Sequence, residues 1–149
     1  MRSSPPTEAQ NGGAVACTTE QTLLGEGTRS DARRGELLRV DILAGHVHRK
    51  RVDDNGGLVP VRTYRVPGTV GATTPVEGDD GWLIAAGRGF VHLSRDGSLR
   101  TLAEVAPAGT RMNDGACDPQ GRFWAGTLAE DHHAGGGALY RSIGPGGPS

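Results

Sequence analysis

A pattern of an aspartate, a glycine and an apolar run occurs three times in this chain. The three copies contain Gly35, Gly81 and Gly121, which are 46 and 40 residues apart. Repeats of about 40–50 residues are typical of β-propellers, in which each repeat forms one four-stranded sheet, or blade. The spacing therefore predicts an all-β fold with about three four-stranded blades and no helix of any length.

The composition supports many short strands joined by tight turns. Glycine accounts for 25 of the 149 residues, and aromatic residues make up only 4%. Residues 40–49 read as strand, turn and strand, with Ala44–Gly45 as the turn. Residues 89–94 and 99–103 read as two strands joined by an Asp-Gly turn at 95–98.

The ends of the chain differ from its middle. Residues 1–21 are rich in small and polar residues and have few large apolar ones, so we expect a disordered N-terminal tail. Residues 22–141 carry the strand patterns of the partial propeller, and residues 142–149 form a Gly/Pro-rich tail. A half propeller leaves strand edges unpaired, so we expect these open edges to favour self-association.

Charge, cysteine content and hydropathy exclude several classes of protein. Sixteen basic and seventeen acidic side chains leave a formal charge of −1 with no basic block, which argues against a nucleic-acid partner. The longest apolar run, residues 83–86, is far too short for a membrane span. The two cysteines, Cys17 and Cys117, make no disulfide framework, so we expect a reducing, cytoplasmic location.

A polar cluster lies at residues 111–115. Arg111, Asn113 and Asp114 precede Gly115, whose conformational freedom could bring a guanidinium, an amide and a carboxylate to one spot. This arrangement favours a binding site. The alternative is a surface turn in which Asn113 and Asp114 hydrogen-bond their own backbone.

A turn and a strand follow this cluster. Residues 118–121, Asp-Pro-Gln-Gly, have the composition of a β-turn. Residues 122–127 are rich in aromatic and small residues over the length of a strand. Glu130 and Asp131 then lie just past the expected end of that strand.

Glu26 is a second candidate site residue. It stands between Gly25 and Gly27, so the backbone can turn sharply and bring its carboxylate close to a ligand. On the residues alone, a single glutamate in such a turn is more often solvated.

The histidines are weaker candidates for metal ligands. His46 and His48 share one strand face, and we interpret that face as exposed. His132 and His133 follow two carboxylates, but adjacent strand side chains point to opposite faces. We therefore expect a solvated loop there rather than a metal cluster.

With these residues the chain resembles the SMP-30/gluconolactonase/regucalcin family of six-bladed β-propeller lactonases. The resemblance is carried by residues 24–27, 40–42, 111–115 and 118–127. It implies a partial six-bladed propeller that corresponds to the N-terminal half of the family's fold. It also implies a metal-dependent lactonase that hydrolyses a cyclic ester, with a sugar lactone as its substrate.

The resemblance assigns roles to four residues. Arg111, Asn113 and Glu130 match family residues that bind the lactone. Glu26 matches one ligand of a single divalent cation. Oxygen ligands of this kind suit calcium or magnesium, and also manganese or zinc.

This sequence also departs from the family pattern. Leu38 and Arg39 replace an aromatic pair, and residues 28–30 replace a run of proline, an apolar residue and tryptophan. The family's metal-binding Asn, and the Asp that is both ligand and proposed general base, would lie beyond Ser149. No catalytic residue is therefore identified. The alternatives to a lactonase are an inactive truncated propeller and a non-catalytic calcium-binding scaffold.

Overall fold

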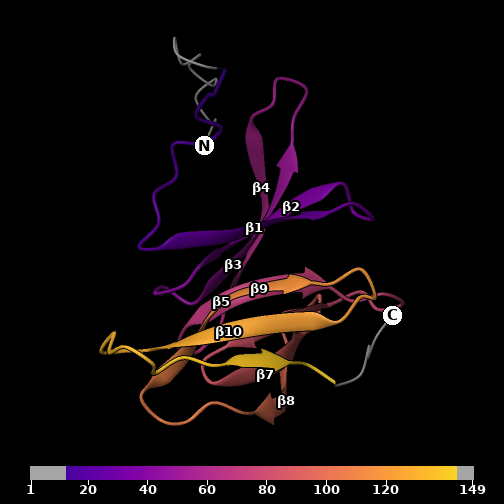
Figure 1. Ribbon diagram of the computed structural model, residues 1–149. Coiled ribbons are helices and arrows are strands. Elements are labelled where there is room, and N and C mark those ends of the chain that lie inside the picture. The colour runs from indigo at the N-terminus through magenta and orange to yellow at the C-terminus, as the bar shows by residue number, and fades with distance from the viewer. Residues whose placement is uncertain (1–12, 144–149) are drawn as a thin grey trace.

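The computed structural model describes residues 13–143, which form eleven β-strands in three antiparallel sheets (Figure 1). The first sheet contains β1 (Gly25–Asp31), β2 (Glu36–Asp41), β3 (His46–Val52) and β4 (Leu58–Arg65). The second contains β5 (Val70–Pro75), β6 (Trp82–Ala86), β7 (Gly89–Leu93) and β8 (Leu99–Glu104). The third contains β9 (Thr110–Cys117), β10 (Phe123–Ala129) and β11 (Leu139–Arg141).

Each sheet is a meander, because its strands pair in chain order. Residues 13–143 contain no helix, and so none that could cross a membrane. The all-β prediction of consecutive blades in a partial propeller is confirmed. The first two sheets have the four strands predicted, and the described part of the third has three.

The turns predicted at Ala44–Gly45 and at residues 118–121 are present in the structure. The Gly45 N–H donates to the Asp41 carbonyl at 3.0 Å, which closes the turn between β2 and β3. The Gly121 N–H donates to the Asp118 carbonyl at 2.9 Å, the bond expected across a four-residue β-turn. These turns depend on local sequence alone, which is why the residue pattern predicts them.

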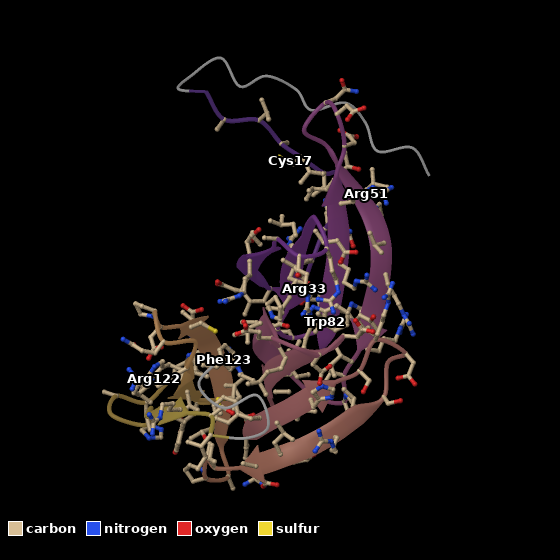
Figure 2. The ribbon with its side chains drawn as sticks, turned by 90° about the vertical axis from the view of Figure 1, so that its right-hand side faces the viewer. Cys17, Arg33, Arg51, Trp82, Arg122 and Phe123 are labelled. Atoms are coloured by element: carbon tan, nitrogen blue, oxygen red, sulfur yellow. The ribbon has the colours of Figure 1, made fainter. Side chains whose placement is uncertain are left out.

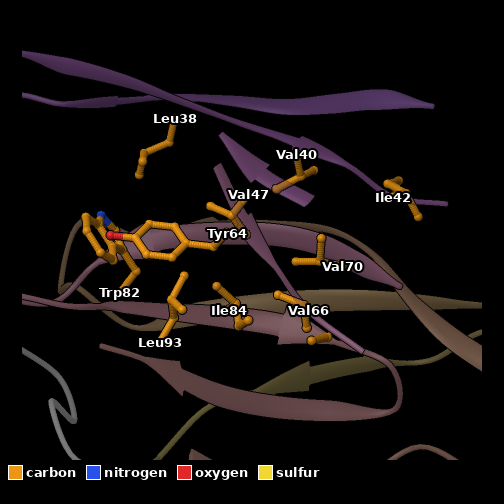
Figure 3. Packing of buried hydrophobic residues seen from close by; sticks show 11 residues of the cluster. Leu38, Val40, Ile42, Val47, Tyr64, Val66, Val70, Trp82, Ile84 and Leu93 are labelled. Carbon is orange, nitrogen blue, oxygen red and sulfur yellow. The ribbon is translucent and has the colours of Figure 1, made fainter. Parts of the chain in front are cut away.

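Two apolar layers join the sheets. The first lies between the first and second sheets, where Leu38 lies across from Trp82 and Val40 across from Val70 (Figure 3). The second lies between the second and third sheets, where the rings of Phe90 and Phe123 are 5.9 Å apart. Burial of each large apolar side chain contributes about 1.5–3 kcal/mol. The sheets therefore stack face to face as successive blades.

A polar network surrounds the fully buried Trp82, which Figure 2 places between the first two sheets. Asp31 Oδ2 accepts hydrogen bonds from Arg34 Nη1 at 2.7 Å and from Trp82 Nε1 at 3.2 Å. The guanidinium carbons of Arg34 and Arg49 lie 4.5 and 5.1 Å from the centre of the Trp82 ring. Glu36 binds Arg49 through two 2.8 Å hydrogen bonds, which raise the pKa of Arg49.

The residues that replace an aromatic pair lie on opposite faces of β2. Leu38 is fully buried against the second sheet. Arg39 points the other way and donates to Thr22 Oγ1 at 3.1 Å. Its charge therefore stays outside the apolar layer, which avoids the cost of a buried unpaired cation.

The two predicted tails lie partly outside the described residues, which exclude 1–12 and 144–149. Residues 13–21 run beside the first sheet, where the Leu58 N–H donates to the Cys17 carbonyl at 3.1 Å. Figure 2 shows Cys17 close to the β3–β4 hairpin.

Candidate functional site

The innermost strands of the three sheets carry a shared irregularity. β1 contacts β5, which in turn contacts β9, and Figure 1 shows β5 and β9 side by side. Each of these strands has one residue more than its partner strand, at 27–28 in β1, Gly71 in β5 and 113–114 in β9. β-Bulges re-aim side chains and are frequent beside active sites. The three bulges therefore mark one level of the inner strands as the candidate site.

Gly71 brings the inner strands into close contact. A Cβ atom at this position would lie 2.5 Å from the Asn113 carbonyl oxygen and 2.8 Å from its nitrogen. Gly27, with a φ of 61°, packs near Gly71, and a Cβ at position 27 would lie 3.5 Å from the Gly71 carbonyl oxygen. Glu26 and Asn113 thus lie at the same level, on the strands that flank β5.

Arg111 is almost fully buried on β9, with 8% of its surface exposed. Its Nη1 donates to the Met112 carbonyl at 3.2 Å and to Asn113 Oδ1 at 3.3 Å. Among residues 13–143, no carboxylate lies within ion-pair distance of this guanidinium. A buried cation without a carboxylate is costly unless another acceptor meets it. Arg111 therefore offers hydrogen-bond donors to a ligand.

The polar cluster lies within β9 and not at a turn. A Cβ atom on Gly115 would clash with the backbone of β10, so this glycine permits close packing of two strands. Gly115 has no positive φ, so the prediction that its conformational freedom brings the three polar groups to one spot is wrong. Arg111 and Asn113 meet because alternate residues share a strand face. Asp114 is exposed and instead accepts a hydrogen bond from the Gly115 N–H at 2.7 Å.

Glu26 is the second residue of β1, and it is exposed. The chain enters β1 over Asp41, whose carboxylate accepts from the N–H groups of Leu23 at 2.8 Å, Leu24 at 3.1 Å and Ala44 at 3.2 Å. Burial raises the pKa of Asp41, but these three hydrogen bonds outweigh it, so the pKa lies below its usual value. Asp41 therefore stays ionised and fixes the approach to Glu26.

Glu130 follows β10 and is exposed. Leu128 pairs with Arg111, so Glu130 lies at the same end of the β9–β10 hairpin as Arg111. The Glu130 N–H donates to the Gly109 carbonyl at 2.8 Å. Equivalent bonds of 2.9 and 2.8 Å close the first two sheets, from Ile42 to Leu24 and from Gly87 to Thr69.

The exposed-face interpretation is wrong for His48, which is only 4% exposed. Its Nδ1 lies 2.8 Å from Thr63 Oγ1, and the described residues before β1 cover this face of β3, with Glu20 3.8 Å away. The loop after Glu130 is solvated as expected, since 59% of the His133 side chain is exposed.

The described residues do not build a complete cation site. Within residues 13–143 there is no group of three His, Cys, Asp or Glu side chains that could hold a metal. Asn113 Oδ1 already accepts a hydrogen bond from Arg111. Glu26 therefore offers one carboxylate ligand, and further ligands would have to come from outside this range.

Neither the close approach at Gly71 nor the role of Asp41 as an acceptor for residues 23–24 was predicted from the sequence. The signal for Gly71 was available, because a glycine inside a strand pattern indicates a bulge or a close backbone approach. Asp41 lies in the segment 40–42 that carries the resemblance, but the local sequence does not indicate its hydrogen bonds to residues 23–24. Its role arises because the fold brings residues 23–24 beside the turn that follows β2.

Comparisons with known proteins agree with this architecture. A family model described as the SMP-30/gluconolactonase/LRE-like region matches residues 24–146. A 6-deoxy-6-sulfogluconolactonase from Pseudomonas putida is 36% identical over 131 residues, which cover 85% of this chain and 43% of that relative. A pentonolactonase from Haloferax volcanii is 33% identical over 118 residues, which cover 79% of this chain and 38% of that relative.

A solved structure shares the same arrangement of sheets. Regucalcin from Agrobacterium tumefaciens, described as a calcium-binding protein, matches with a TM-score of 0.70 and 28% sequence identity. The match covers 80% of this chain and 40% of that one. The chain spans about two fifths of the length of the curated relatives it matches.

Proposed function

Because the chain belongs to the SMP-30/gluconolactonase/LRE-like family, we propose that its inner strands form part of the substrate site of a sugar lactonase. Such an enzyme hydrolyses the cyclic ester of a sugar acid. Two of the relatives are named as lactonases of this kind. The proposal concerns the region that this chain contributes to such a site.

The buried guanidinium of Arg111 is the observation that carries the proposal. It lies on an innermost strand and has no carboxylate partner among the described residues. A structural arginine at this depth is normally paired. A lactone offers carbonyl, ring and hydroxyl oxygens, which a guanidinium fork can bind in a fixed geometry.

Asn113 and Glu130 complement Arg111. Because Asn113 Oδ1 accepts from Arg111, its amide NH₂ group is left to donate to substrate oxygens. The Glu130 carboxylate, just past β10, accepts hydrogen bonds from sugar hydroxyls. Together the three side chains orient the ring, and this orientation is their contribution to catalysis.

Glu26 is proposed as one ligand of a divalent cation, which could be calcium, magnesium, manganese or zinc. Glu26 is exposed and stands beside Gly27, which packs near Gly71, and this place on β1 suits the role. When bound, such a cation would polarise the lactone carbonyl. Residues 13–143 give Glu26 no complete set of His, Cys, Asp or Glu ligands.

A second candidate function is a non-catalytic calcium-binding scaffold or an inactive propeller fragment. It is favoured by the incomplete ligand set among residues 13–143. In either case we propose a cytoplasmic protein that can associate with itself through its open edges.

Lactone binding and turnover separate these functions. We expect the purified chain to show little or no hydrolysis of gluconolactone, measured by proton release, with calcium, zinc or manganese present. We also expect it to bind a non-hydrolysable lactam analogue in calorimetry. Arg111→Ala should weaken that binding about tenfold or more, because it removes charged hydrogen bonds.

Arg51→Ala is the matched control, since Arg51 is exposed on β3, and it should leave binding unchanged. Equal binding of the lactam by the Arg111→Ala variant and the unmodified chain would contradict the proposed substrate site. Metal-dependent turnover that Glu26→Gln abolishes would instead show that this chain assembles a complete catalytic site.

A further inference from the structure

Residues 17–24, called the strap, lie along the first sheet before the chain enters β1. The Leu58 N–H donates to the Cys17 carbonyl at 3.1 Å, which attaches the outer end of the strap beside the β3–β4 hairpin. At the inner end, the Asp41 carboxylate holds two successive backbone N–H groups of the strap. The strap is thus fixed to the sheet at both ends.

An ion pair holds the middle of the strap. Lys50 Nζ donates to Glu20 Oε2, and the side chains are 4% and 36% exposed. No other carboxylate among residues 13–143 lies within ion-pair distance of Lys50. Burial raises the pKa of Glu20, but the hydrogen bond and charge of Lys50, with smaller help from His48 and Arg39, bring it below its usual value.

His48 lies on β3 next to this ion pair. Its Nδ1 is 3.8 Å from Glu20 Oε1, and its buried Nε2 has no partner within the described chain. The charged or titratable groups that act on His48 are Glu20, Lys50, His46 and Arg39. Burial lowers the pKa of His48 and the three bases lower it further, which outweighs the opposing effect of Glu20. The covered ring is therefore neutral at pH 7.

We propose that the strap is an acid-released latch, which lies on the first sheet at neutral pH and lifts between Cys17 and Thr22 when His48 takes up a proton. Lifting hydrates the imidazole and its unpartnered Nε2, so the lifted state binds the proton more tightly than the covered state. Asp41 still holds the inner end of the strap. Release therefore stops before β1 and does not depend on the proposed lactone site.

The direction of the pH effect follows from where each state binds the proton. Lifting exposes His48 and removes the burial that is the largest cause of its lowered pKa, whereas Lys50, His46 and Arg39 stay on the sheet in both states. Loss of Glu20 opposes this effect but is the smaller cause, so the pKa in the lifted state is higher than in the covered state and closer to the ordinary value of about 6.5. The equilibrium constant for attachment of the strap is therefore largest above about pH 6.5. Below that pH it falls by up to about tenfold per pH unit, and it stops falling below the pKa of the covered ring. Protonation of Glu20 adds to release only below its own usual pKa of 4.5.

A nitroxide label on Cys17 reports the motion of the strap directly. Cys17 and Cys117 are both free thiols, so a Cys117→Ser background gives a single labelling site. We expect an immobilised electron paramagnetic resonance spectrum near pH 7.5, with a mobile component that grows from about pH 6.5 to 5.5 and reverses on neutralisation. A spectrum that stays the same over this range overturns the proposal.

Two variants and one titration separate this latch from general acid unfolding. His48→Gln should keep the label immobile throughout, whereas His133→Gln, in the exposed loop, should retain the full pH response. A full response in the His48→Gln variant contradicts the latch. In the unlabelled chain, an NMR titration of the His48 ring should give a pKa below about 6.5, and a value at or above it overturns the proposal without any variant.

Discussion

Asp31 joins two sheets through one carboxylate. It is 1% exposed at the end of β1, and its Oδ2 accepts hydrogen bonds from Arg34 of its own sheet and from Trp82 of the next. Its Oδ1 has no partner in the described part of the chain. The contact is thus a charged hydrogen bond in a setting with little water, where loss of one partner is costly.

Replacement of this carboxylate should destabilise the fold. Asp31→Ala leaves the Trp82 indole N–H and the Arg34 guanidinium without their acceptor, so we expect a loss of about 2–4 kcal/mol in the free energy of unfolding. Urea denaturation followed by tryptophan fluorescence measures it. Asp54→Ala, in an exposed turn, is the control and should change stability by less than about 0.5 kcal/mol. Equal losses in both variants would contradict the role given to Asp31.

Contacts of site residues could be predicted from the sequence only where the two residues are close together in the chain. Arg111 and Asn113 are two residues apart, so their contact needs only a strand. Asp114 belongs to the same polar segment, but its side chain does not join Arg111 and Asn113. The reason is the bulge of β9 at residues 113–114. The burial of Arg111 depends on the packing of whole sheets, which no short pattern contains.

At the scale of the strand, the bulge of β5 decides how close the inner strands come. Gly71→Ala would place a methyl group 2.5–2.8 Å from the Asn113 backbone, so β9 must move away. We expect a loss of about 1–3 kcal/mol in stability, as for other overpacked sites, together with weaker binding of the lactam analogue.

Gly126→Ala is the matched control for Gly71→Ala. It lies in β10 with no positive φ, and its new methyl group would meet only the Ala138 carbonyl oxygen, at 3.9 Å. This variant should keep the stability of the unmodified chain. Calorimetric unfolding measures the stability of both variants. Equal stability of Gly71→Ala and Gly126→Ala would show that β9 moves away from the added methyl group without loss of stability.

The hairpins could be predicted, but the contacts between sheets could not. Turn residues such as Asp118 and Gly121 act on their own neighbours, so the sequence indicates the turn directly. The cover over His48 comes from Glu20, 28 positions earlier in the chain, and was therefore missed.

At the scale of the whole molecule, the third sheet offers an open face and edge. Phe123 and Ala125 pack toward the second sheet, so the alternate residues Trp124 and Leu128 point away from it. Leu139, on the outer strand β11, is 67% exposed. Among residues 13–143, β11 has a neighbouring strand on one side only, and this edge combined with apolar side chains favours pairing with another chain.

We therefore expect the chain to self-associate at micromolar concentration. Sedimentation velocity over a range of concentrations should show a dimer or larger species, and Leu139→Lys should reduce their share because a charge on an edge strand opposes pairing. Asn55→Lys, in the exposed turn between β3 and β4, is the control for added charge and should leave the share of these species unchanged. A single monomeric species at every concentration would contradict this expectation.

The bonds that close the inner hairpins, from Ile42 to Leu24, Gly87 to Thr69 and Glu130 to Gly109, join main-chain atoms only. These three closing bonds therefore do not depend on the side chains of the residues that they join. If Glu26 and Glu130 have the roles proposed above, substitutions at these positions change the molecule recognised while the same main-chain bonds persist. A lineage built on these hairpins can acquire new substrates one side chain at a time, without first having to evolve a new fold.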